Sequence, residues 1–127
     1  MAKGIYKLSG VEEYFERIQQ VGFDILRAAE RAVDAGSDVI LGGMVRRVPK
    51  DTHNLENHLG KEIEIDGDQV TAVVGLLNAD ADTARYGNVQ EYGSSSMSAH
   101  PYVRSAFDED RRRAMTAMKK ELKGYVE

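Results

Sequence analysis

The chain has no cysteine among its 127 residues and only two prolines. Without cysteine it can form no disulfide, no catalytic thiolate and no cysteine-bound metal site. No apolar run approaches the roughly 20 residues that a membrane helix requires, and no signal-like stretch follows the first residues. We therefore expect a soluble protein that is not exported. With 42% hydrophobic and 30% charged residues it fits a single domain over residues 1–127.

Recognisable chemistry is also scarce. Asp51, His53, Glu56 and His58 place four possible metal ligands within eight residues. The two histidines are five positions apart, so on one helix they point roughly 140° away from each other instead of converging. The serines Ser94–Ser96 have no adjacent histidine and carboxylate, and no phosphate-binding glycine pattern occurs. The sequence therefore predicts no catalytic residue, no cofactor and no metal, and we expect no enzyme.

A long amphipathic helix is predicted over about residues 10–47. Ser9 and Glu12 have capping-box spacing at its start, and Pro49 forces Val48 out of the helical region at its end. Apolar residues recur at helical spacing, and we expect them to face the core: Val11, Phe15, Ile18, Ile25, Ala29, Val33, Ile40 and Met44. Glycines disfavour helix, so we expect a bend or break near Gly22.

The remainder of the chain predicts a hairpin and a second helix. A short turn holding Leu55 and Leu59 precedes strictly alternating residues, which predict a hairpin over about 61–77. Residues 78–83 look like a loop, and residues 85–92 like a third short strand or an irregular link. A C-terminal helix over about 101–123 follows Pro101, with apolar spacing along its length, and Gly124 is its expected stop. The predicted fold class is α+β: a small antiparallel sheet packed with a long N-terminal and a C-terminal helix.

Charge is distributed unevenly. Residues 50–92 hold nine acidic and three basic side chains, whereas residues 93–127 hold five acidic and seven basic ones. This asymmetry is compatible with a plain solvated surface or with head-to-tail pairing between subunits. The candidate interface residues are Arg111, Arg112 and Arg113 against Glu62, Glu64, Asp66 and Asp68, with a docking loop at Ser94, Ser95, Ser96 and Met97. No concentrated basic stripe of the kind that binds nucleic acid is present.

Two segments resemble the paired signatures of one protein family. The first signature matches at Pro49, Asp51, Thr52 and Leu55, and the second at Glu91, Tyr92, Gly93, Pro101, Tyr102 and Arg104. The family is the tail-completion or head–tail joining group of tailed bacteriophages, also described as minor tail components. The likeness in order and spacing extends over nearly the whole chain. It departs from the family at His53, where glycine is usual, at Glu56, where arginine is common, and at Ser98, where proline is common.

The resemblance implies a structural virion protein at the phage neck, assembled in the cytoplasm of the bacterial host. It implies a homo-oligomeric ring, such as a hexamer, that contacts portal-connector and tail-tube proteins and lets genome DNA pass without specific binding. The signature residues would then have structural roles, and the charged and loop residues named above would lie at interfaces with other subunits or partners. Two other classes stay open on the residues alone: a small dimeric binding or regulatory module, and a metal-dependent hydrolase using Asp51, His53 and His58.

Overall fold

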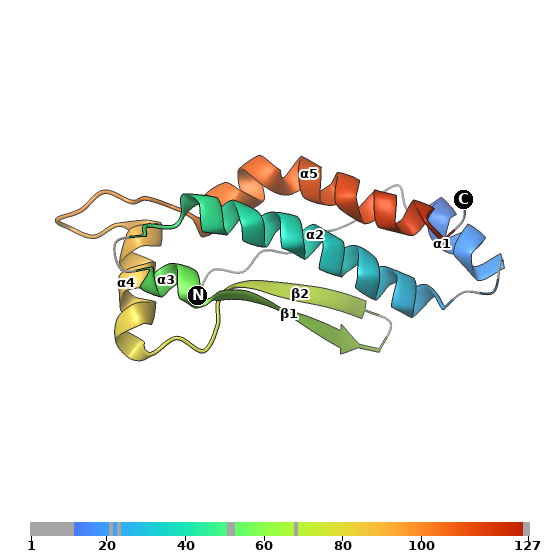
Figure 1. Ribbon diagram of the computed structural model, residues 1–127, viewed down its shortest axis with the longest axis horizontal. Coiled ribbons are helices and arrows are strands. Elements are labelled where there is room, and N and C mark those ends of the chain that lie inside the picture. Colours follow the sequence, from blue (N-terminus) through green and yellow to red (C-terminus); the bar gives the residue numbers. More distant parts are fainter. Residues whose placement is uncertain (1–11, 21, 23, 51–52, 68, 126–127) are drawn as a thin grey trace.

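Three layers lie on one another in the molecule (Figure 1): α5 above, α2 in the middle and a two-stranded hairpin below. The computed structural model describes residues 12–20, 22, 24–50, 53–67 and 69–125. In chain order the elements are α1 (Glu12–Gln20), α2 (Ile25–Arg47), α3 (Asn54–Asn57), β1 (Leu59–Asp66), β2 (Gln69–Leu76), α4 (Ala81–Tyr92) and α5 (Val103–Lys123). The expected α+β class, with its long N-terminal helix and antiparallel hairpin, is confirmed.

The predicted break in the N-terminal helix is also confirmed. α1 stops at Gln20, Gly22 adopts a φ of 86°, and Asp24 begins the next helix by accepting a 2.9 Å hydrogen bond from the Leu26 amide. α2 ends at Arg47 because Val48, which precedes Pro49, is extended. Ser9 and the Glu12 side chain, which form the predicted capping box, lie outside the described residues.

Small residues on α2 allow α5 to approach closely. The buried face of α2 includes Ala28, Ala32, Gly36 and Gly43, together with the predicted Ile40 and Met44. Ala28 and Ala32 each lie one position before a predicted core residue, Ala29 or Val33, that is only partly buried. A Cβ on Gly36 would lie 2.6 Å from Met118 Cγ of α5, so only glycine fits without a shift. Gly36 and Gly43 therefore do not break α2; they lie at the contact between the two helices.

The hairpin packs one face on α2. Its register runs unbroken from the pair Leu59 and Leu76 to the pair Asp66 and Gln69. On the inner face the Lys61 ammonium pairs with Asp34 and Asp38 of α2, at 2.5 Å from Asp38 Oδ1. The outer face carries exposed acidic side chains, as predicted: Glu62, Glu64 and Asp66.

The sequence interpretation of residues 78–92 was largely wrong. The expected third strand or irregular link at 85–92 is part of the helix α4, which begins at Ala81 inside the expected loop. The cause is an N-cap: the carboxylate of Asp80 accepts hydrogen bonds from the Thr83 amide at 3.2 Å and the Thr83 hydroxyl at 2.6 Å. Within the described residues the sheet consequently has two strands.

The C-terminal helix agrees with its prediction. α5 begins at Val103, two residues after Pro101, and ends at Lys123 before Gly124. The predicted stripe is buried, except for the partly buried Phe107: Val103, Ala114, Met118 and Leu122. Two apolar clusters result, one around Ile40, Leu55 and Tyr102, and another that joins α1 to both long helices through Ile18, Ala32 and Leu122.

Candidate functional site

Glu91 joins the end of α4 to the beginning of α5. The residue is only 2% exposed. The carboxylate accepts hydrogen bonds from the backbone amides of Tyr102 at 2.9 Å, Val103 at 2.8 Å and Arg104 at 3.0 Å. These are the unpaired amides of the first turn of α5, and the N-cap residue Tyr102 supplies no side-chain cap. One buried carboxylate from a different helix therefore caps α5.

Arg104 completes this junction. Its Nε donates to Glu91 Oε2 at 2.9 Å, and its guanidinium also donates to the Glu91 backbone carbonyl. The guanidinium carbon lies 4.7 Å from the centroid of the Tyr92 ring, a cation–π contact on the surface. A buried charge is tolerable only when it is paired and hydrogen-bonded, and this one is both. Four of the second-signature residues (Glu91, Tyr92, Tyr102 and Arg104) therefore form one unit, which we call the Glu91 junction.

The ionisation of Glu91 makes the junction sensitive to acid. Burial opposes the charged form, but hydrogen bonds from Val103, Arg104 and Tyr102 outweigh it and hold the pKa of Glu91 below its ordinary 4.5. A carboxyl whose pKa is lowered by folding stabilises the folded state above its unfolded pKa and loses that contribution as the pH falls through its folded pKa.

We accordingly expect the free energy of unfolding to drop as the pH falls below about 4.5, the ordinary Glu value. Asp110 acts in the same direction, because its hydrogen bond with Arg47 lowers its pKa. The contribution of Glu91 to this loss of stability is measured by urea unfolding of the wild type and of Glu91→Gln at pH 7 and at pH 3. The variant should lose less stability between the two pH values; equal losses would contradict the assignment.

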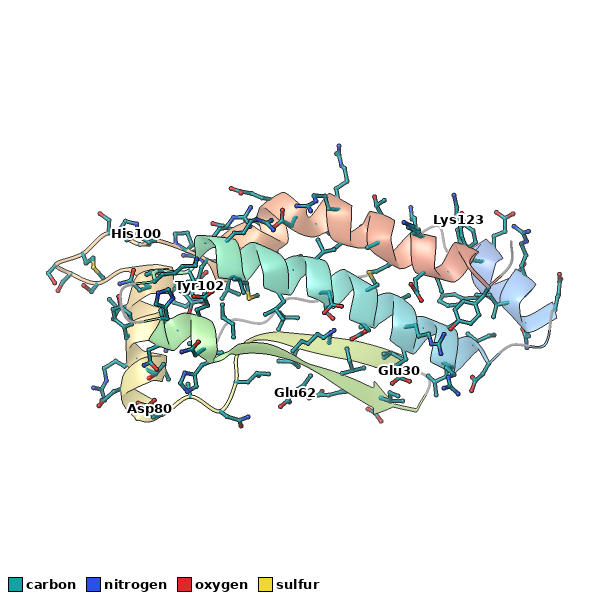
Figure 2. All side chains as sticks on the ribbon, viewed as in Figure 1. Glu30, Glu62, Asp80, His100, Tyr102 and Lys123 are labelled. Carbon is teal, nitrogen blue, oxygen red and sulfur yellow. The ribbon has the colours of Figure 1, made fainter. Side chains whose placement is uncertain are left out.

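The segment from Gly93 to Pro101 extends beyond the helices at one end of the molecule (Figure 1). Gly93 has a φ of 78°, and a Cβ there would lie 2.9 Å from both the Met97 carbonyl oxygen and the Ala99 nitrogen. The Ser94 amide donates to Met97 at 2.8 Å, and the His100 amide donates to Gln90 of α4 at 2.7 Å. Figure 2 shows His100 on this segment and Tyr102 at its base. We call residues 93–101 the projecting loop; one backbone hydrogen bond closes it internally and another ties its end to α4.

The predicted docking residues form a turn of this loop, in which Ser94 and Met97 pair with each other and Ser95 and Ser96 lie between them. Ser94, Ser95 and Ser96 are exposed and Met97 is half-buried. The loop combines a fixed base with a polar, exposed tip. Such a segment can reach a neighbouring molecule while the Glu91 junction keeps its direction constant.

The first signature packs against the second. Leu55, on α3, is 1% exposed and belongs to the same apolar cluster as Tyr102. Both meet Gly87 of α4, where a Cβ would lie 2.9 Å from the Tyr102 hydroxyl and 3.3 Å from Leu55 Cδ2. His53 has a φ of 60°, a left-handed conformation that favours glycine, the residue that the resembled family has there. Asp51 and Thr52 lie outside the described residues.

The charged candidates occupy opposite outer layers. Arg111, Arg112 and Arg113 are exposed on α5, and the acidic hairpin residues are exposed below α2; Asp68 lies outside the described residues. Figure 2 shows the same separation between Lys123 of α5 and Glu62 of β1. A contact between α5 of one copy and the hairpin of the next would join opposite faces and extend a stack, whereas a closed ring needs contact surfaces inclined to each other.

Acidic residues of α5 mainly pair with α2. Asp110 is 4% exposed and lies 2.7 Å from Arg47 Nη1 and 3.1 Å from Arg46 Nη2, while Glu109 lies 2.6 Å from Arg47 Nη2. Pairing within α5 is limited to Arg113, whose Nη1 lies 3.5 Å from Asp110. Sequence analysis missed this cluster. The helical spacing of Asp110 from Val103 and Ala106 could have revealed it, because that spacing places Asp110 on the buried face of α5.

No metal centre emerges among the described residues, where no group of three or more possible ligands converges. His53 Nδ1 lies 2.9 Å from Glu56 Oε2, and His58 Nδ1 lies 2.8 Å from the Asn54 carbonyl oxygen. A cavity of about 260 Å³ adjoins the Glu91 junction and is walled mainly by apolar groups, including Leu76, Ala79 and Val103. We find no arrangement of catalytic groups around it in the described part of the chain.

Comparison of the chain with protein-family models, with curated proteins and with solved structures produced no match. None of the helices in the described residues is long and apolar enough to cross a membrane.

Proposed function

We propose that this chain is a structural assembly protein at the neck of a tailed bacteriophage, where it completes the tail and joins it to the head. The observation that carries the proposal is the Glu91 junction. Glu91 accepts hydrogen bonds of 2.8–3.0 Å there from three amides that lie eleven to thirteen positions further along the chain. These bonds fix the direction of the projecting loop between them. A fixed loop at the end of an elongated subunit suits docking to another large assembly, and no catalytic arrangement competes with this interpretation among the described residues.

In this proposal the protein forms a homo-oligomeric ring between the portal complex and the tail tube. Genome DNA passes through the ring, and the exposed acidic residues Glu62, Glu64 and Asp66 repel its phosphates so that DNA slides without binding. The basic residues Arg111, Arg112 and Arg113 lie on the opposite layer and are available to acidic neighbours in the neck.

Binding of purified protein to isolated tail tubes and portal complexes, followed by electron microscopy and sedimentation, tests the function. We expect Met97→Glu to weaken binding by about tenfold or more, because it places an unpaired charge in the projecting loop. Gln19→Glu is the matched control, since it adds the same charge at an exposed position on α1, at the opposite end of the molecule.

Equal binding by both variants would overturn the role of the loop, and no binding by the wild type to either assembly would overturn the neck function. A stable dimer of fixed size that ignores tails and portals would instead favour the binding-module alternative.

A further inference from the structure

Both edges of the hairpin carry unpaired backbone groups within the described residues. The Leu77 amide donates to the His58 carbonyl at 2.8 Å, which marks residues 58 and 77 as a hydrogen-bonded pair. Such pairs alternate along an antiparallel ladder, and the register has no bulge. Val70, Ala72 and Val74 of β2 therefore direct their amides and carbonyls away from β1, and alternate residues of β1 direct theirs away from β2.

The two edges differ in how they are protected from pairing. Exposed edges are usually guarded by charges, prolines or bulges. β1 contains Lys61, Glu62, Glu64 and Asp66, whereas the eight residues of β2, from Gln69 to Leu76, include no charge and no proline. The edge of β2 is therefore open to an added strand from Gln69 to Val73, where its residues are exposed or partly buried, whereas Val74 and Leu76 are buried.

The β1 edge of one copy is a better partner for the β2 edge of another copy than for a second β1 edge. Pairing β1 with β1 of another copy would bring Glu62 and Glu64 close to like charges, and pairing β1 with the uncharged β2 avoids this. β1 also has apolar surface to cover, because the large apolar side chain of Ile65 is 49% exposed. Two copies joined by β2 alone would leave this surface open.

Subunits related by rotation around a ring can all form the same β2–β1 pairing with their neighbours. β1 and β2 are antiparallel, so a copy related by rotation presents its β1 edge antiparallel to the β2 edge of its neighbour. Strand twist lets such a repeated sheet curl and close.

We propose that β2 of each subunit pairs with β1 of the next copy, so that the hairpins form one continuous antiparallel sheet around a ring. The inner layer of the ring is then the sheet, with Glu62, Glu64 and Thr71 facing the channel and α2 and α5 outside. This inference rests on the proposed function for its ring, but the pairing itself can be tested without phage components.

Cysteine crosslinking is a direct test because the chain has no cysteine of its own. In the new ladder, Thr71 of β2 and Glu62 or Glu64 of the neighbouring β1 occupy the closely spaced, non-hydrogen-bonded positions. Thr71→Cys protein is mixed with Glu62→Cys or with Glu64→Cys protein under mild oxidation. We expect the mixed product to dominate with at least one partner over either self-crosslinked product, and over Gln19→Cys as the collision control.

Crosslinking of Thr71→Cys mainly with itself would overturn the proposal in favour of a two-fold dimer. Mixed yields no higher than those of the Gln19→Cys control would overturn any pairing of these edges.

A second variant tests the hydrogen bonds themselves. Ala72→Pro removes an outward-facing amide and should weaken self-association by roughly a hundredfold or more, while Ala72→Ser keeps the amide and should assemble normally. Circular dichroism and sedimentation check the folding of each monomer. Assembly of a folded Ala72→Pro protein at the wild-type concentration contradicts edge pairing.

The two proposals fail separately. Rings that bind tail tubes without the mixed crosslink would leave the neck function in place and remove the edge pairing. A crosslinked ring that binds neither tails nor portals would support the edge pairing and overturn the neck function.

Discussion

Replacement of Glu91 by alanine is expected to lower the free energy of unfolding by about 3–5 kcal/mol, the usual effect of removing one partner from a buried charge pair. The substitution leaves the buried amides of Tyr102 and Val103 and the partly buried amide of Arg104 without their acceptor, and it leaves the Arg104 Nε without its carboxylate. Urea unfolding followed by circular dichroism measures the change.

Glu109→Ala is the matched control for this substitution. Glu109 also pairs with an arginine, at 2.6 Å from Arg47 Nη2, but its side chain is 65% exposed. Exposed pairs of this kind contribute less than about 1 kcal/mol. Glu91→Gln should fall between the wild type and Glu91→Ala, since it keeps one acceptor oxygen and loses the charge. If Glu91→Ala and Glu109→Ala unfolded at the same urea concentration, the junction would not hold α5 as we describe.

Two adjacent glycines of α2 should respond to alanine in opposite directions. A Cβ on Gly43 would lie 2.1 Å from Asp110 Oδ2 and 2.9 Å from Arg47 Nη1. Gly43→Ala must therefore push α5 away and disturb the ion pairs of Asp110, at a cost of about 1–3 kcal/mol. At Gly42 the nearest atom is Arg46 Nη1, 3.8 Å away, so Gly42→Ala should gain up to about 1 kcal/mol from helix propensity.

Gly43→Ala and Gly42→Ala make the same chemical change one residue apart in the same helix. Opposite signs of their changes in the free energy of unfolding would therefore show that α5 packs closely against Gly43. Thermal and urea unfolding of the pair give these signs. Stabilisation by both substitutions would mean that α2 and α5 do not pack as closely in solution as the structure has them.

Local rules were sufficient for much of the fold. Pro49 ended α2, Gly22 separated it from α1, and strict alternation located the hairpin to within two residues. Each of these outcomes depends on the backbone preferences of neighbouring residues, which is why sequence reasoning reached them. The same approach failed over residues 85–92, where short apolar and polar residues carry no clear period. The N-cap that Asp80 forms with the Thr83 amide is a local signal, and it starts the helix that includes these residues.

The sequence by itself determined the class of fold, the boundaries of its long helices and the acidic face of the hairpin. Tertiary structure alone decided that Glu91 caps α5, that Asp110 turns inward to Arg46 and Arg47, and that Gly43 lies at a helix contact. The physical reason is distance along the chain: Asp110 meets arginines 63 and 64 residues away, and such a meeting depends on how whole helices pack. Propensity and periodicity act over a few residues, so they specify the elements and not the groups that these elements bring together.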